Sequence, residues 1–239
     1  MTELTPALPV EINDEDQQVP WTLRDTWIGF SLFFVLLIGF SITKNFFTKT
    51  WMLAVLLLIY QPLQFIPVWI ILRLRNASWA DLGFKKAVPN VLAIGCGFVI
   101  LAFGISFVNN IFMVLFHVQV QAEKFFALAS DLNNPVVLLI TGAVIAPIFE
   151  ETIFRGFIFS GLRQKYGWKK AALINSALFA LCHFQIAAFI PTFTLGFVFS
   201  YLRQRSSSIW PGIILHTLVN SFSLCLLVTV LQNSSLVLF

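Results

Sequence analysis

Residues 149–155, which read Phe-Glu-Glu-Thr-Ile-Phe-Arg, hold charged side chains inside an apolar segment. Of the 11 Asp and Glu residues of the chain, only Glu150 and Glu151 fall within an apolar run, and of the 15 Lys and Arg residues only Arg155 does. A charge at the centre of a membrane costs roughly 2.5–3.5 kcal/mol on insertion scales. Three such charges therefore need partners, water or a cavity, and together they predict a functional site.

Helical spacing gives these three residues different roles. Glu151 and Arg155 are four residues apart, so they share a helix face and can form an ion pair. Glu150 is rotated from Glu151 by about 100° and faces elsewhere. We predict that Glu151 and Arg155 support the site and that Glu150 is the working carboxylate. The alternative is that Glu150 lies at the membrane interface beside the basic segment 161–170 and does no chemistry.

Three further polar residues in apolar segments could join Glu150. His183 ends the sequence Phe-Ala-Leu-Cys-His, and His216 and Asn220 share a helix face at a spacing of four. At 1.5 Å per residue, Glu150 lies about 15 Å, His183 about 18 Å and His216 about 8–15 Å from the same membrane side. These depths allow the three side chains to meet. The third histidine, His117, lies at the end of a segment and is not a candidate.

This set of residues fits peptide hydrolysis by an activated water. A carboxylate can act as the base, a histidine can pass the proton to a leaving amine, and imidazole and amide donors can stabilise an oxyanion. A zinc site formed by Glu150, His183 and His216 is the alternative, although the His-Glu-x-x-His helix of soluble metalloproteases is absent. Taken singly, each histidine could be only an interhelical hydrogen-bond donor, and Asn220 only a packing contact.

The composition predicts an all-α, polytopic transmembrane helical bundle. The chain has 239 residues, is 58% hydrophobic and 11% charged, and has a mean hydropathy of +0.86. Residues 1–22 contain five acidic residues and no Lys or Arg, which predicts a polar, disordered tail without a cleaved leader. Residues 23–239 would form one membrane domain, whose motifs lie at about 140–222. The net charge of +4 is interpreted as a sign of membrane topology, not of nucleic-acid binding.

We predict about seven helical segments. They lie at about 26–43, 50–72, 91–116, 135–160 and 211–231, with a two-helix hairpin over 171–202 that turns near 185–188. The loops 73–88, 161–170 and 203–208 together hold ten Lys and Arg residues, whereas the alternating loops 44–50, 117–134 and 185–188 hold three. The positive-inside rule therefore predicts a multi-pass protein of the cell membrane with a cytosolic N-terminus.

Three motifs, in this order, resemble the intramembrane CAAX-protease and bacteriocin-processing (Abi) family. They are Glu-Glu-x-x-x-Arg at 150–155, Phe-x-x-x-His at 179–183 and His-x-x-x-Asn at 216–220. The resemblance covers about residues 140–222 and implies an endopeptidase that acts near the cytosolic membrane face.

The resemblance also implies roles for individual residues. Glu150 and His183 would activate the water, His216 and Asn220 would form the oxyanion site, and Glu151 and Arg155 would support them. The substrate would be a peptide or protein, lipidated or not, within the lipid bilayer. No cofactor is expected to be required, and zinc remains the alternative because the family has been described both as glutamate proteases and as metalloproteases. The competing hypothesis is a non-catalytic membrane protein for bacteriocin immunity or partner binding, or a small transporter.

Overall fold

The computed structural model describes residues 18–43, 46, 50–87, 89–118 and 135–236. These residues form helices and the turns between them, with no strand in the described part, which confirms the all-α prediction. Three helices come first: α1 (Leu23–Thr43), α2 (Thr50–Leu74) and α3 (Pro89–Leu115). A long helical stretch follows, made of α5 (Pro135–Leu138), η3 (Leu139–Ile145), α6 (Ala146–Glu151), η4 (Thr152–Ile158) and α7 (Phe159–Leu181). The last two helices are α8 (Ile186–Ser206) and α9 (Trp210–Leu236).

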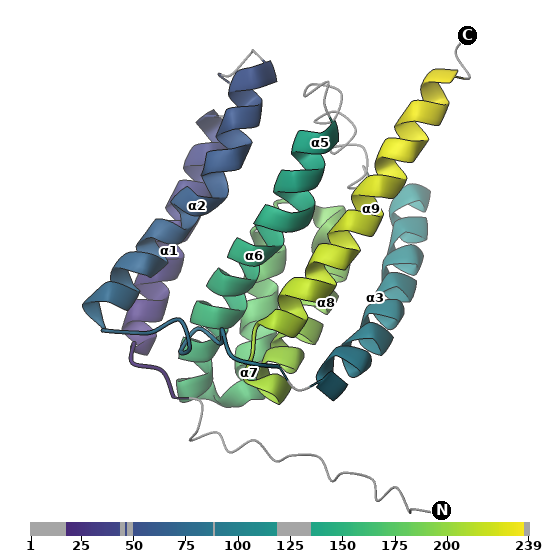
Figure 1. Ribbon diagram of the computed structural model, residues 1–239. Coiled ribbons are helices and arrows are strands. Elements are labelled where there is room, and N and C mark those ends of the chain that lie inside the picture. The colour runs from purple at the N-terminus through teal and green to yellow at the C-terminus, as the bar shows by residue number, and fades with distance from the viewer. Residues whose placement is uncertain (1–17, 44–45, 47–49, 88, 119–134, 237–239) are drawn as a thin grey trace, which may run out of the picture.

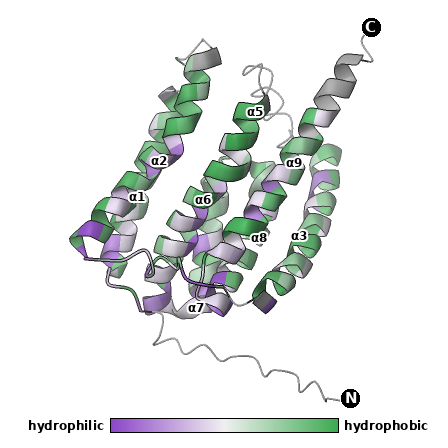
Figure 2. Ribbon diagram, viewed as in Figure 1, coloured by the Kyte–Doolittle hydropathy of each residue, from purple (hydrophilic) through white to green (hydrophobic). Residues whose placement is uncertain are grey.

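The helices have the length and composition of membrane spans. Within the described residues, five helical stretches are long and apolar enough to cross a bilayer, namely Leu23–Thr43, Met52–Leu74, Asn90–Leu115, Val136–Leu181 and Ile186–Ser206. A shorter apolar stretch covers Trp210–Leu226. Figure 2 shows that hydrophobic residues dominate these helices and that hydrophilic residues gather at one end of the bundle. The chain is therefore a multi-pass membrane protein.

The predicted basic loop 161–170 is wrong, because most of this segment is helical. Helix α7 runs from Phe159 to Leu181 and is broken at Gly167, whose φ of 71° and ψ of 162° leave the helical region. Glycine adopts a positive φ without the steric penalty of a Cβ atom. Lys and Arg are good helix formers, so the basic residues extend the helices on both sides of this break. Counted with the break, the described helices form about seven segments, as predicted.

The turn of the predicted hairpin also lies earlier than expected. Helix α7 ends at Leu181 and α8 begins at Ile186, so the turn covers residues 182–185 and not 185–188. Phe184 has a φ of 50°, which completes the reversal of the chain. His183 consequently lies in the turn and not in a helix.

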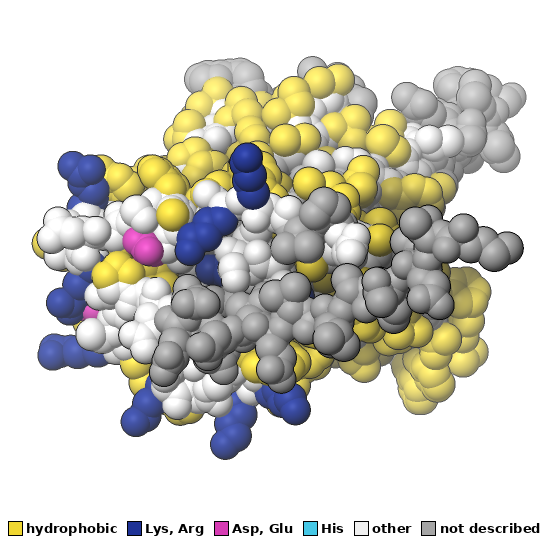
Figure 3. All heavy atoms as spheres, turned by 60° about the horizontal axis from the view of Figure 1, so that its bottom comes forward, with side chains coloured by type: hydrophobic (Ala, Val, Ile, Leu, Met, Phe, Trp, Pro, Cys, Tyr) yellow, Lys and Arg dark blue, Asp and Glu magenta, His cyan; other side chains and the backbone are white. Residues whose placement is uncertain are grey.

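The three most basic segments lie at one end of the bundle, the lower end in Figure 1. Contacts between the connections show this directly: Arg75 Nε lies 2.9 Å from Asp25 Oδ2, Gln164 Nε2 donates to the Trp21 carbonyl at 3.2 Å, and Ser208 Oγ donates to the Lys85 carbonyl at 2.6 Å. Figure 3 shows Lys and Arg side chains spread over this end. We refer to it as the basic end.

The packed bundle begins before the predicted boundary at residue 22. Residues 1–17 of the predicted tail lie outside the described part of the chain. Trp21 is described and is only 1% exposed. Its indole stacks on Phe157 at 5.2 Å, and its Nε1 donates to the Phe157 carbonyl at 3.3 Å. Trp21 therefore anchors the start of the chain against η4, the segment that carries Arg155.

The orientation in the cell remains a prediction that a fusion experiment can check. Because the basic end should face the cytosol, the opposite end, where α9 finishes, should face outside. Alkaline phosphatase fused after Phe239 should be active, and fluorescent protein fused there should stay dark. The same reporters fused before Met1 should behave in the opposite way. Fluorescence from the C-terminal fusion would show that the orientation is reversed.

Candidate active site

Two π-helical segments flank the helix that carries the glutamates. Helix α6 ends with Glu150 and Glu151, η3 precedes it, and Arg155 lies within η4. Pro147 has no backbone N–H and lies where η3 passes into α6. Short π-helical segments occur frequently at functional sites, because they shift side chains away from regular helical positions.

Arg155 is the centre of a fully buried polar cluster. Its Nη1 lies 2.9 Å from Glu151 Oε1, and both side chains are 0% exposed. Its Nη2 donates to the Gly196 carbonyl of α8 at 3.2 Å. The guanidinium also lies over the rings of Phe179 at 4.3 Å and Phe199 at 5.4 Å. The predicted ion pair is thus present, and it links η4 to α7 and α8.

His216 of α9 lies between the two glutamates. Its Nδ1 is 3.0 Å from Glu151 Oε1, and its Nε2 is 3.7 Å from Glu150 Oε2. A carboxylate only accepts hydrogen bonds, so Nδ1 carries the proton that it donates to Glu151. This fixes the tautomer and turns Nε2 toward Glu150. The His216 ring stacks on Phe199 at 5.2 Å, which holds its orientation.

Glu150 differs from Glu151 in its environment, as the helical spacing predicts. Its side chain is 23% exposed, and within the described residues no Lys or Arg forms an ion pair with it. Nε2 of His216 lies 3.7 Å from Glu150 Oε2, which is too long for a direct hydrogen bond. The Glu150 carboxylate is therefore accessible, whereas the Glu151 carboxylate is buried and paired.

His183 does not contact Glu150 in the described part of the structure. Its Nδ1 donates to the Phe179 carbonyl at 2.7 Å. In the neutral imidazole, Nε2 is then the ring nitrogen that can accept a hydrogen bond. The Phe179 ring lies 4.8 Å from the His183 ring and 5.9 Å from the His216 ring. Phe179 thus packs against both imidazoles. The sequence predicted His183 as the partner of Glu150, but His216 lies beside this carboxylate instead.

Asn220 forms a hydrogen bond that holds two helices together. Its Nδ2 donates to the Gly142 carbonyl at 2.9 Å, which ties α9 to η3. This is the alternative that the sequence left open for Asn220. Its role in an oxyanion site stays a prediction.

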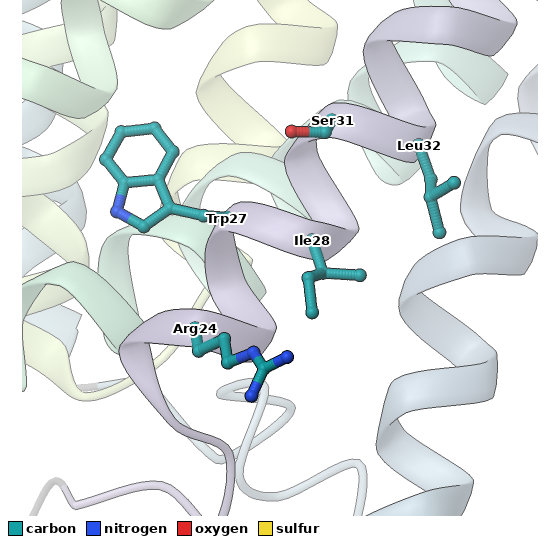
Figure 4. Close-up of a pocket in the computed structure, with 5 residues that line it drawn as sticks. All are labelled: Arg24, Trp27, Ile28, Ser31 and Leu32. Atoms are coloured by element: carbon teal, nitrogen blue, oxygen red, sulfur yellow. The ribbon is translucent and has the colours of Figure 1, made fainter.

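The alternative zinc site would need Glu150, His183 and His216 around one metal ion. Among the described residues, no group of three His, Cys, Asp or Glu side chains is arranged to hold a metal ion. Two of the three predicted ligands, Glu150 Oε2 and His216 Nε2, lie 3.7 Å apart, and the zinc-dependent alternative stays a prediction. An open cavity of about 400 Å³ lies elsewhere, on α1, and Arg24, Trp27, Ile28, Ser31 and Leu32 line it (Figure 4).

Gly212 is a site residue that the sequence motifs did not indicate. A Cβ atom at this position would lie 2.6 Å from Glu151 Oε2, a buried oxygen that has no hydrogen-bond partner within the described residues. The glycine therefore allows the backbone of α9 to pack against the carboxylate. Its signal in the sequence is its position four residues before His216, on the same helix face.

Replacing Gly212 by alanine should displace Glu151 and misorient His216. Because Glu151 is held by Arg155 and His216, it cannot move freely, so we expect a loss of stability of about 1–3 kcal/mol. Thermal unfolding of the purified protein measures this loss. Gly97→Ala in α3 is the matched control, since nothing lies within 4 Å of its Cβ position and alanine favours the helix. Equal unfolding temperatures for the two variants would contradict this account of Gly212.

The part of the chain that forms this site matches a known protein family. Residues 132–222 match the family of type II CAAX prenyl endopeptidases described as Rce1-like. This match confirms the resemblance. The matched segment contains every predicted site residue from Glu150 to Asn220, whereas α1, α2 and α3 lie outside it. The similarity to Rce1-like proteins therefore supports a membrane protease at the level of the family.

Curated relatives agree with the family match. YdiL of Bacillus subtilis (strain 168), described as a candidate membrane peptidase, is 28% identical over 149 residues, which are 62% of this chain and 59% of YdiL. An uncharacterised 24.3 kDa protein of Escherichia coli is 30% identical over 131 residues, which are 52% of this chain and 60% of that protein. The UPF0177 protein YxdF of Lactococcus lactis is 34% identical over 80 residues, 33% of this chain and 44% of YxdF. The chain thus spans about half to three fifths of the length of these relatives. No solved structure matches.

Proposed function

We propose that this protein is an intramembrane endopeptidase in which Glu150 activates the attacking water. The observation that carries this proposal is the pairing of an accessible carboxylate, Glu150, with Nε2 of His216, whose other nitrogen is fixed by the buried Glu151. A base with an oriented imidazole beside it is the arrangement that general acid–base catalysis requires. The similarity to the Rce1-like family supports the reaction class.

The reaction begins with removal of a proton from water. A water molecule beside Glu150 and His216 can hydrogen-bond both Oε2 and Nε2. Glu150 takes its proton while the water oxygen attacks the carbonyl carbon of the scissile peptide bond. The carbonyl π electrons move to oxygen and form a tetrahedral oxyanion.

Collapse of this oxyanion completes the hydrolysis. The C–N bond breaks, its electron pair goes to nitrogen, and the proton taken by Glu150 is passed to the leaving amine, directly or through Nε2 of His216. The products are a carboxylic acid and an amine, which become a carboxylate and an ammonium ion once the acid gives up its proton. The second N–H of the Asn220 amide is the proposed donor that stabilises the oxyanion.

Arg155 and Glu151 act through His216 and not on the substrate. The buried Arg155 guanidinium neutralises Glu151, so that this carboxylate can accept the Nδ1 proton without an unpaired charge. His216 is then held in one tautomer with Nε2 toward Glu150. This arrangement assigns the two adjacent glutamates separate tasks.

The substrate is proposed to be a peptide cleaved near the cytosolic membrane face. Purified wild-type protein in detergent should cleave either a farnesylated CAAX peptide or members of an unprenylated peptide library, and mass spectrometry of the products identifies the bond. Cleavage that persists in chelator supports the metal-free reaction, whereas loss in chelator with recovery on adding zinc supports the metal-dependent alternative. No cleavage of any peptide by the wild type would favour the non-catalytic hypothesis.

A further inference from the structure

A second buried cation lies at the basic end of the bundle, away from the glutamates. Arg203, in the last turn of α8, is only 4% exposed. Its Nη2 donates to Ser160 Oγ at 3.4 Å. Its other two nitrogens, Nε and Nη1, are buried and have no hydrogen-bond partner in the described part of the chain. Within the described residues, no carboxylate forms an ion pair with Arg203.

The surroundings of Arg203 add positive charge. Arg163 of α7 is also 4% exposed, donates to Gln204 Oε1 at 3.1 Å, and repels the Arg203 guanidinium. Arg205 follows two residues later, and its Nε is also buried, with no hydrogen-bond partner among the residues that the structure describes. A buried charge with unsatisfied donors is strongly unfavourable unless an opposite charge compensates it. The cluster therefore has the chemistry of a site for an anion.

The connection between α2 and α3 covers this cluster of arginines. Gly83 has a φ of 94°, and a Cβ atom there would lie 2.8 Å from Arg203 Nε. Two hydrogen bonds hold this connection to the start of α9, from Ile209 N to the Gly83 carbonyl and from Ser208 Oγ to the Lys85 carbonyl. A ligand that binds Nε would therefore have to displace Gly83 from its position against the guanidinium.

The position of the cluster indicates which anion it would meet. If the basic end faces the cytosol as predicted, Arg203 would lie near the lipid head groups, where basic pockets between transmembrane helices bind phosphates. Along α8, Arg203 is seven residues, or about 10 Å, from Gly196, which contacts Arg155. A ligand here would not occupy the Glu150–His216 site.

We propose that Arg203 anchors a phosphate group at the basic end, supplied by an anionic lipid head group or by free phosphate. Guanidinium donors match phosphate oxygens in geometry and charge, and a phosphate has enough acceptors for both unsatisfied nitrogens. Binding would compensate the buried charge and stabilise the packing of α7, α8 and the α2–α3 connection.

Thermal unfolding of the purified full-length protein in neutral detergent tests this proposal. One arm adds phosphatidylglycerol against phosphatidylcholine, and the other adds inorganic phosphate against chloride at equal ionic strength. At a ligand concentration about 100 times Kd, the wild-type Tm should rise by about 5–10 °C. A rise with phosphatidylglycerol alone identifies the lipid head group, and an equal rise with inorganic phosphate identifies free phosphate.

Two variants separate this site from general attraction to a basic surface. Arg203→Gln should lose the Tm rise and, without added anion, should unfold at the wild-type temperature or above it, because an uncompensated buried charge is gone. Lys170→Gln, an exposed residue of the same end, should keep the rise. Arg203→Lys should keep a smaller part of the rise, since it retains the charge without the planar fork.

Three results would overturn the proposal. The first is an unchanged wild-type Tm with both phosphate sources. The second is an equal rise in wild type and Arg203→Gln, which would place the anion elsewhere. The third is an Arg203→Gln protein that is much less stable than wild type in anion-free detergent, which would make Arg203 a structural residue only. None of these measurements depends on peptidase activity.

Discussion

Glu150→Gln should lower peptide turnover by about 10²–10⁴-fold while the protein remains folded. The substitution keeps the size of the side chain and removes the carboxylate that takes the proton from water. Glu150 is 23% exposed and its polar neighbour, His216 Nε2, is 3.7 Å away, so little packing depends on its charge. We therefore expect a Tm close to that of the wild type and a fall in kcat with a small change in KM.

The adjacent glutamate provides the contrast for this experiment. Glu151→Gln should reduce both turnover and Tm, because it removes the partner of Arg155 and His216 in a fully buried cluster. A kcat for Glu150→Gln equal to that of the wild type would exclude Glu150 as the base. The measurement is steady-state cleavage of whichever peptide the wild type accepts, together with thermal unfolding of each variant.

Arg155→Ala should have the largest effect on stability among the site variants. It leaves the Glu151 carboxylate buried without a cation and removes the contacts of the guanidinium with Phe179, Phe199 and the Gly196 carbonyl. Breaking a buried pair in this way costs about 3–5 kcal/mol. For a chain of this length, that corresponds to a fall in Tm on the order of 6–20 °C. Turnover should fall as well, since His216 loses its fixed carboxylate partner.

The chain contains a matched control for this prediction. Arg75 and Asp25 form an ion pair of the same 2.9 Å length, but the Arg75 side chain is 44% exposed. Exposed pairs contribute about 0–1 kcal/mol, so Arg75→Ala should change Tm little. The double variant Glu151→Ala, Arg155→Ala should be less destabilised than the sum of its single variants. Equal falls in Tm for Arg155→Ala and Arg75→Ala would contradict the role of Arg155 as a buried counter-ion.

Local geometry explains which parts of the site could be predicted from the sequence. The Glu151–Arg155 pair follows from a spacing of four on one helix, and the accessible position of Glu150 follows from its rotation. The neighbour of Glu150 could not be predicted in the same way, because contacts between helices depend on their relative rotation and packing. Phe179 packs between the two imidazoles and the His216 ring lies on Phe199, so His216 and not His183 comes next to Glu150.

Some parts of the fold could likewise be predicted from the sequence and others could not. Long apolar runs predicted the membrane helices to within a few residues. The segment 161–170 was predicted as a loop from its basic charge, although Lys and Arg favour helices and only Gly167 interrupts this one. The π-helical segments around Glu150 carry no residue pattern that distinguishes them from regular helix. The packing role of Gly212 becomes visible only when α9 is placed against Glu151.

The central claim is that water, activated by Glu150, attacks the peptide without a covalent intermediate. Cys182 is the side chain that could compete with water as the nucleophile, because it is a free cysteine next to His183 in the sequence. The most direct measurement is intact-protein mass spectrometry during turnover in ¹⁸O-labelled water. The account predicts one ¹⁸O atom in each new C-terminal carboxylate and an enzyme mass that stays unchanged throughout. An enzyme that gains the mass of the acyl fragment, with the adduct on Cys182, would show that a side chain and not water is the nucleophile.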